Sequence, residues 1–88
     1  MYKYLVEFFA TTFFIYVILA TGNALAIGAA LALAILLTSN ISGGYLNPAV
    51  SITMASIGKL DVNDLLPYCA AQTLGGLTAL EIYKRVKL

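Results

Sequence analysis

The stretch "SGGYLNPAVS", residues 42–51, interrupts an apolar sequence with two glycines, an asparagine and a proline. Its glycines disfavour a helix, so residues 40–47 are predicted to form a loop. Asparagine is a strong N-cap because its side-chain oxygen accepts a free backbone N–H, and proline at the first helical position has no N–H to leave unpaired. The pair Asn47 and Pro48 therefore predicts that a new helix begins here.

This helix is predicted to cover residues 48–57 and to end at Gly58, a residue type that commonly terminates helices. It would be about 15 Å long, half of the ~30 Å hydrocarbon core of a bilayer. The alternative is a helix lying on the membrane surface, but such helices carry a basic face and residues 48–57 carry no charge. Loop backbone is tolerated at membrane depth only inside protein or beside a watery cavity. We therefore predict a re-entrant loop and half-helix.

The composition also indicates a membrane protein. Of the 88 residues, 61% are hydrophobic and 10% are charged, and the mean hydropathy is +0.92, whereas a soluble domain carries about 25% charged residues. The net charge of +1 gives no reason to expect a nucleic-acid partner. Cys69 is the only cysteine and there is no histidine, which excludes an intrachain disulfide and a Cys/His metal site. We expect no cofactor, and no enzyme, because no nucleophile–base pair is evident.

Three apolar segments flank the half-helix, and each is predicted to cross the bilayer as a helix, because open strands cannot cross lipid. Their ranges are 4–21, 24–39 and 64–86. The first segment, with Lys3 before it and "ALA" after it, also resembles a cleavable signal peptide. Glu7 inside the segment and the turn at residues 21–23 argue against that alternative. The whole chain, 1–88, is then a single all-α integral membrane domain.

The predicted loop and half-helix bring polar groups to the middle of the bilayer. A helix N-terminus is the positive end of the helix dipole, and the Asn47 amide lies beside it. The carbonyls of Gly43, Gly44 and Tyr45 offer acceptors in a row. This combination suits a neutral hydrogen-bonding solute and repels cations, whereas cation channels use acidic rings. An aqueous pore is the resulting prediction.

The same stretch resembles the first Asn-Pro-Ala box of the aquaporin and aquaglyceroporin, or major intrinsic protein, family. "VEFFATTFF" at residues 6–14 resembles the first span of that family, with Glu7 at its glutamate position. "PYCAAQTLGG" at residues 67–76 resembles the third span, with Gln72 and Gly75 in register. The resemblance covers essentially the whole chain. It implies three transmembrane helices plus one re-entrant half-helix, which is half of an aquaporin-like fold.

The resemblance also implies roles for individual residues. Asn47 would donate to the passing solute, and Pro48 and Ala49 would lock two half-helices together. Glu7 would hydrogen-bond to loop backbone, and the alternative is a side chain that extends to the membrane surface. Tyr45 stands where the family usually has histidine, and its hydroxyl can still anchor the loop. The glycines that would let helices approach closely are Gly28, Gly75 and Gly76.

The family builds one pore from two inverted repeats, and this chain matches one of them. We therefore expect two copies to pair antiparallel as a homodimer, and the resemblance implies an assembly of four such pairs. The topology places Lys3 and Lys59 on one side of the membrane. The cations expected on the other side are Lys84, Arg85 and Lys87. Two cations on one side and three on the other give almost no bias toward one orientation in the membrane. A chain that inserts in both orientations requires such a balance.

The narrowest ring of the family's pore takes one residue from the second span, one from the fifth, and two from the second box, including an Arg three places after its Asn. In an inverted pair these positions map to Ile27 of one chain and to Ile35, Gly44 and Val50 of the other. The ring would be aliphatic, without the arginine's charge and donors. The expected solutes are then water and small neutral molecules such as glycerol or urea. The alternative is that the aliphatic residues only pack or face lipid.

Two other function classes stay open. The chain could be a non-conducting fragment or accessory protein that packs with another channel half. It could also be a small secondary transporter, although such proteins usually have an ionisable residue at the binding site. Only Glu7 is available for this role, and it lies near a helix end.

Overall fold

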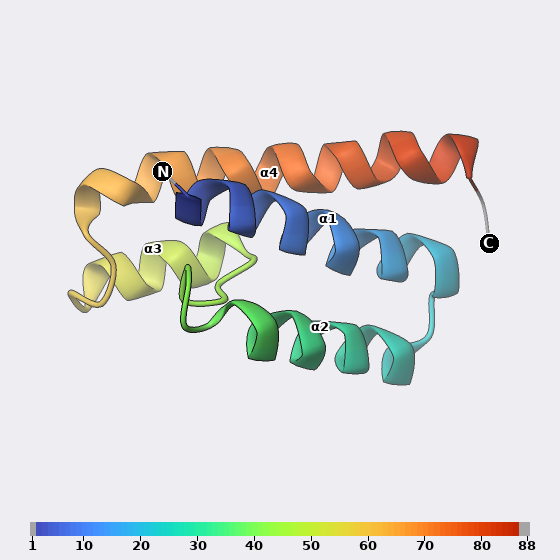
Figure 1. The fold of residues 1–88 in the computed structure, drawn as a ribbon, viewed down its shortest axis with the longest axis horizontal. Coiled ribbons are helices and arrows are strands. Elements are labelled where there is room, and N and C mark those ends of the chain that lie inside the picture. The colour runs from blue at the N-terminus through green and yellow to red at the C-terminus, as the bar shows by residue number, and fades with distance from the viewer. Residues whose placement is uncertain (1, 87–88) are drawn as a thin grey trace.

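The computed structural model describes residues 2–86, and this part of the chain contains helices and no strand. The helices are α1 (Tyr2–Thr21), α2 (Ala24–Thr38), α3 (Pro48–Ser56) and α4 (Val62–Arg85). Helices α1, α2 and α4 run along the long axis, whereas α3 lies along one half of it only (Figure 1). α1 packs against both α2 and α4, and α3 packs against α4. Lys87, which is expected on the same side of the membrane as Lys84 and Arg85, lies outside the described residues.

Local capping explains where three of these helices begin. The side chain of Asn23 accepts a hydrogen bond from the Ala26 N–H at 2.9 Å, and that of Asn47 from the Ala49 N–H at 2.8 Å. Asp61 caps α4 in the same way. α3 therefore starts at Pro48. The Asn47-Pro48 pair in the sequence predicted a helix start at this residue. Its N-terminus points to the middle of the bundle (Figure 1).

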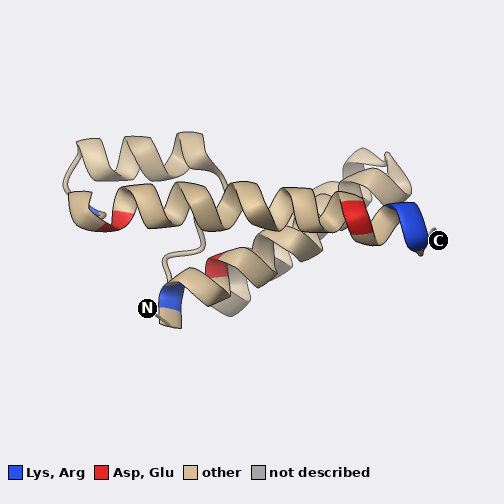
Figure 2. Cartoon of the chain, turned by 90° about the horizontal axis from the view of Figure 1, so that it is seen from above, with Lys and Arg blue, Asp and Glu red and all other residues tan. Residues whose placement is uncertain are grey.

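The outside of the chain is apolar along its length and charged at its two ends. The long dimension is 39 Å, enough for a ~30 Å hydrocarbon core with room for both interfaces. Charged residues gather toward the two ends of the bundle (Figure 2), and Glu7 on α1 is fully buried. Among the described helices, only α1 is both long and apolar enough for a span by length and composition. α2 has 15 residues, and α4 is longer but less apolar, so their crossing stays a prediction.

Burial in this chain is the reverse of that in a soluble protein. Leu25 is 83% exposed and Leu66 is 78% exposed. Many other large apolar side chains are exposed as well. The largest fully buried side chains all carry polar groups, and they are Tyr68, Gln72, Glu7 and Ser51. In soluble proteins the aliphatic residues are the ones most often buried, and Glu is almost never buried without a partner. The interior is therefore organised around hydrogen bonds, and the surface is suited to lipid.

Gly75 brings α1 and α4 into close contact. A Cβ added at Gly75 would lie 2.7 Å from the backbone oxygen of Phe8, which leaves no room for a side chain. Thr12 completes the contact by donating to the Gly75 carbonyl at 3.1 Å. Gly76 is less crowded, since a Cβ there would lie 3.7 Å from Ile15. A Cβ on Gly28 would meet nothing within 4 Å, so Gly28 makes no close helix approach inside a single chain.

Candidate functional site

Glu7 on α1 holds the loop that precedes α3. Its side chain is 0% exposed, which excludes the alternative that it extends to the membrane surface. Oε1 accepts the Leu46 N–H at 2.8 Å and the Gln72 amide N–H at 2.9 Å. Oε2 accepts the Ser42 hydroxyl at 2.6 Å and the Tyr45 N–H at 3.1 Å. Each carboxyl oxygen thus accepts two hydrogen bonds, and the loop is fixed to α1.

Gln72 on α4 extends this network to the half-helix. Its amide nitrogen also donates to Ser51 Oγ at 2.8 Å, and its oxygen lies 3.1 Å from the same hydroxyl. Tyr68 donates its hydroxyl to the Ser42 carbonyl at 2.7 Å. Sequence reasoning identified Glu7 and Gln72 but missed Ser42, Ser51 and Tyr68. The available signal was that polar side chains at predicted membrane depth need partners.

Two N–H groups of the loop backbone, those of Tyr45 and Leu46, donate to Glu7. The carbonyls of Gly43, Gly44 and Tyr45 accept no hydrogen bond from residues 2–86. Gly43 and Gly44 have φ values of 96° and 66°, a conformation that suits glycine. Leu46 has φ 56°, which costs roughly 1–2 kcal/mol for a residue with a side chain. The bond from its N–H to Glu7 offsets that strain.

Asn47 ends the loop with a free donor. Its Oδ1 is occupied by the Ala49 N–H, so the side-chain amide nitrogen is the group left to bind another molecule. The residue is exposed, and its Nδ2 donates to no residue within 2–86. The positive end of the α3 dipole lies at the same place. A hydrogen-bond donor and a positive potential thus coincide beside the row of free carbonyls.

Two hollows meet at Asn47. The first, which we call the pore hollow, measures ≈ 180 Å³ and brings together Ile35, Gly44 and Val50, three of the four residues of the predicted ring. The remaining lining residues are Phe14, Leu31, Tyr45, Leu46 and Asn47. Ile27 does not line it, and lies about two turns earlier on α2.

The second, which we call the midplane hollow, measures ≈ 370 Å³ and is lined in part by Asn47 and Pro48. It is lined by residues of α1 and α4, namely Thr11, Phe14, Ile15, Gln72, Thr73, Gly76 and Leu77, and by Leu46 of the loop. Ala49 lines neither hollow, although its backbone N–H is bonded to Asn47.

Tyr45 anchors the loop differently from what its sequence position suggests. Its hydroxyl bonds to no residue within 2–86, so the expected hydroxyl anchor is not made. Instead its ring packs on Gly43, where an added Cβ would lie 2.8 Å from the ring, and on Tyr68, with ring centroids 5.8 Å apart. The backbone N–H bond to Glu7 completes the anchoring.

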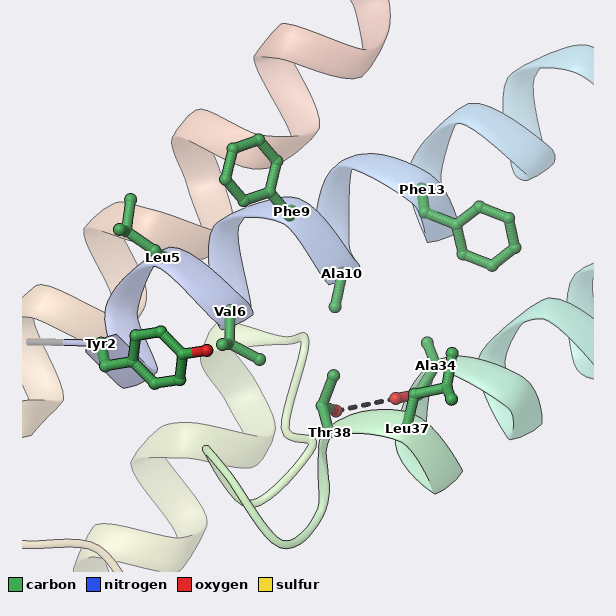
Figure 3. A pocket seen from close by; sticks show the side chains of 9 residues that line it. All are labelled: Tyr2, Leu5, Val6, Phe9, Ala10, Phe13, Ala34, Leu37 and Thr38. Carbon is green, nitrogen blue, oxygen red and sulfur yellow. Dashed lines mark hydrogen bonds between the residues drawn. The ribbon is translucent and has the colours of Figure 1, made fainter.

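A larger groove of ≈ 460 Å³ lies between α1 and α2 (Figure 3). Its lining is apolar except for Tyr2 and Thr38, and the Thr38 hydroxyl is already bonded to the Ala34 carbonyl at 2.7 Å. The groove therefore offers little to a polar solute, and the hollows beside Asn47 form the candidate site.

Buried polar side chains on α1 and α4 thus hold the loop and the short helix α3 of an otherwise apolar helical chain. The profile of the family described as Major intrinsic protein matches residues 1–87. The chain belongs to this family, and is an aquaporin-like membrane protein.

Relatives of this chain include proteins from bacteria and mammals. It is 39% identical over 88 residues to glycerol uptake facilitator protein-like 6 of Lactiplantibacillus plantarum, covering 90% of this chain and 41% of that protein. It is 48% identical over 63 residues to aquaporin-8 of Mus musculus, covering 72% of this chain and 24% of the relative. Aquaporin Z of Brucella melitensis is 43% identical over 61 residues, with 69% and 27% covered. The chain thus spans less than half the length of these relatives.

Proposed function

We propose that two copies of this chain, inserted in opposite orientations, form a passive pore for water and small neutral solutes of the glycerol and urea type. The observation that carries the proposal is the orientation of the loop. Glu7 accepts the N–H groups of Tyr45 and Leu46. The carbonyls of Gly43, Gly44 and Tyr45 accept no hydrogen bond within residues 2–86, so they and the Asn47 amide are available to a passing solute. Such groups replace the water that a neutral polar molecule loses on entering the bilayer.

A second copy supplies what one chain lacks. α3 has nine residues and is about 14 Å long, so one copy provides a half-helix for only part of the 39 Å long dimension. An inverted copy would place its own α3 along the remaining part, with the two Asn47 side chains facing each other. Each mouth would then have one aliphatic ring, with Ile27 from one chain and the pore hollow from the other.

The same arrangement would exclude cations and protons. Two helix N-termini and two amide donors at the centre make the potential positive, which repels cations and fixes the orientation of central water. The ring carries no charge, because Val50 stands where the family pattern has Arg. A wider, uncharged ring admits glycerol-sized solutes as well as water.

Charge at the two ends is compatible with insertion in either direction. Lys3 bonds to Asp64 at the start of α4, and Lys59 lies between α3 and α4. Lys84 and Arg85 lie in the last turn of α4, at the other end of the bundle. The sequence adds Lys87 after these, so two cations are expected on one side and three on the other. This small difference gives almost no bias toward either orientation during insertion.

The test is to fix the orientation by adding charge. Thr21→Lys with Val86→Lys adds two cations at one end, and Ser56→Lys with Val62→Lys adds two at the other; all four positions are exposed. We expect each double variant alone to lose solute flux into vesicles, and co-expression of the two to restore it. The matched Gln substitutions, which add no charge, should conduct like the unmodified chain. Full flux from either charged variant alone would contradict the proposal.

A further inference from the structure

A charged cluster outside the candidate site joins the first turn of α1 to the first turn of α4. Asp64 accepts the Lys3 ammonium at 2.6 Å through Oδ2 and the Tyr4 hydroxyl at 2.5 Å through Oδ1. The Lys3 ammonium also lies 5.9 Å from the centre of the Tyr4 ring, a distance at which a cation is attracted to the ring face. The Asp64 side chain is 15% exposed and that of Lys3 is 37% exposed. Dissolved ions can therefore reach the cluster.

Tyr4 connects this cluster to the interior of the bundle. Its ring meets the ring of Tyr68 edge-on, with the ring centroids 5.9 Å apart and the planes at 87°. Such pairs are favourable because the positive edge of one ring lies against the negative face of the other. Tyr68 is 1% exposed and lies one helical turn after Asp64 on the same face of α4. Asp64 thus holds Tyr4 by its hydroxyl, and the ring of Tyr4 in turn supports Tyr68.

Tyr68 is the contact from the cluster to the loop. Its hydroxyl donates to the Ser42 carbonyl at 2.7 Å, and its ring lies against that of Tyr45, with the centroids 5.8 Å apart. Ser42 directly precedes the three residues whose carbonyls accept no hydrogen bond within residues 2–86. Tyr68 therefore fixes the position at which the row of free carbonyls begins, whereas Glu7 holds the N–H groups further along the loop.

The packing of α1 on α4 does not depend on the cluster alone. Thr12 donates to the Gly75 carbonyl near the middle of the two helices. Toward the opposite end, the Tyr16 hydroxyl donates to the Val86 carbonyl at 2.6 Å. A broken cluster would therefore leave the two helices together, and its effect would reach the loop through the aromatic rings.

We propose that Asp64 is a positioning residue of the pore, and that the Lys3–Asp64 pair makes solute passage sensitive to ions at the membrane surface. With the pair closed, Tyr4 supports Tyr68, and Tyr68 holds the first carbonyl of the loop in line with the free carbonyls. Salt weakens exposed ion pairs, which releases Tyr4 and lets the row of carbonyls lose its alignment. In an antiparallel pair of chains one such cluster lies at each membrane face. This inference rests on the proposed function, because it concerns the regulation of that pore.

The test measures the order of the loop separately from solute flux. Hydrogen exchange of the Tyr45 and Leu46 amides, which donate to Glu7, reports on the loop. Glycerol entry into liposomes, with equal KCl on both sides, reports on the pore.

Two variants each remove one bond of the cluster. Asp64→Asn removes the charge that pairs with Lys3. Tyr4→Phe removes a hydroxyl but keeps the acidic charge at the start of α4, so it separates the cluster from the helix dipole. The matched control is Tyr16→Phe, which also removes a hydroxyl that joins α1 to the end of α4, but away from the cluster.

We expect the two loop amides to exchange about fivefold faster in Asp64→Asn and in Tyr4→Phe, the effect of one hydrogen bond, and at the unmodified rate in Tyr16→Phe. Glycerol flux through the unmodified chain should fall about twofold between ~0.02 M and ~0.5 M KCl, the effect of a surface ion pair. Flux through Asp64→Asn should be lower and independent of salt.

Unchanged exchange in Tyr4→Phe, or equally fast exchange in Tyr16→Phe, would overturn the positioning role. Flux through the unmodified chain that does not change with salt, or flux through Asp64→Asn that still falls with salt, would overturn the sensitivity to ions. If the exchange results are as expected but no glycerol passes at any salt concentration, the proposed function fails while the connection from Asp64 to the loop stands.

Discussion

Replacing Glu7 with Gln tests whether the loop is held by a side chain that only accepts hydrogen bonds. The two carboxyl oxygens of Glu7 receive four donors, from Ser42, Tyr45, Leu46 and Gln72. An amide of the same shape has one oxygen and one NH₂ group. Two of the four donors would then face a donor instead of an acceptor. We expect the loop to lose its fixed position in the Glu7→Gln variant.

The magnitude follows from the number of bonds lost. A hydrogen bond to a charged group contributes about 1.5–3 kcal/mol, so two such bonds amount to roughly 3–6 kcal/mol. Stability would be measured by unfolding the reconstituted chain with increasing SDS in mixed micelles. Glu81→Gln is the control, because Glu81 is exposed and pairs with Lys84 and Arg85 on its own helix. Surface pairs of this kind contribute less than about 1 kcal/mol.

The result that would refute this reasoning is equal stability of the two variants. Hydrogen exchange separates the loss of loop structure from the loss of stability of the whole chain. The Tyr45 and Leu46 amides should exchange much faster in Glu7→Gln, because both donate to the carboxyl group. Unchanged protection of these two amides would mean that Glu7 does not hold the loop.

Four further substitutions test other parts of the account. Val50→Arg should reduce glycerol entry into liposomes much more than water entry, because a guanidinium narrows the aliphatic ring; equal effects would remove Val50 from the pore wall. Asn47→Asp should admit cations and protons, because a carboxylate attracts them and removes the amide donor; an unchanged leak with normal water flux would contradict the role of Asn47. Gly75→Ala should destabilise the chain by about 1–3 kcal/mol, since its Cβ would lie 2.7 Å from the Phe8 oxygen. Gly76→Ala has room for its methyl group and should be neutral or stabilising by up to about 1 kcal/mol.

The start of α3 could be predicted from the sequence because capping is local. Asn47 and Pro48 are adjacent, and together they determine where the helix begins. The partners of Glu7 could not be obtained in this way. Ser42 and Gln72 lie 35 and 65 residues from it along the chain. The sequence therefore left Glu7 between a buried and a surface position until the packing of α1 on α4 was known.

Other features depend on which atoms meet in three dimensions. Ser51 looks like any small residue in a helix, and only its position opposite Gln72 makes it part of the network. Tyr45 was expected to anchor the loop by its hydroxyl, but the space above Gly43 is filled by its ring. An added Cβ at Gly28 would meet nothing within 4 Å among residues 2–86, so its expected packing role stays a prediction.

The central claim is that two inverted copies complete one pore. The most direct measurement is the distance between spin labels placed singly at residue 49 or residue 59 in bilayer-embedded pairs. An antiparallel pair predicts a short distance between the two labels at residue 49, at the start of α3. It predicts about 30 Å or more between the two labels at residue 59, because two half-helices of ~14 Å lie end to end between them. Short distances at both positions would show a parallel pair and contradict the account.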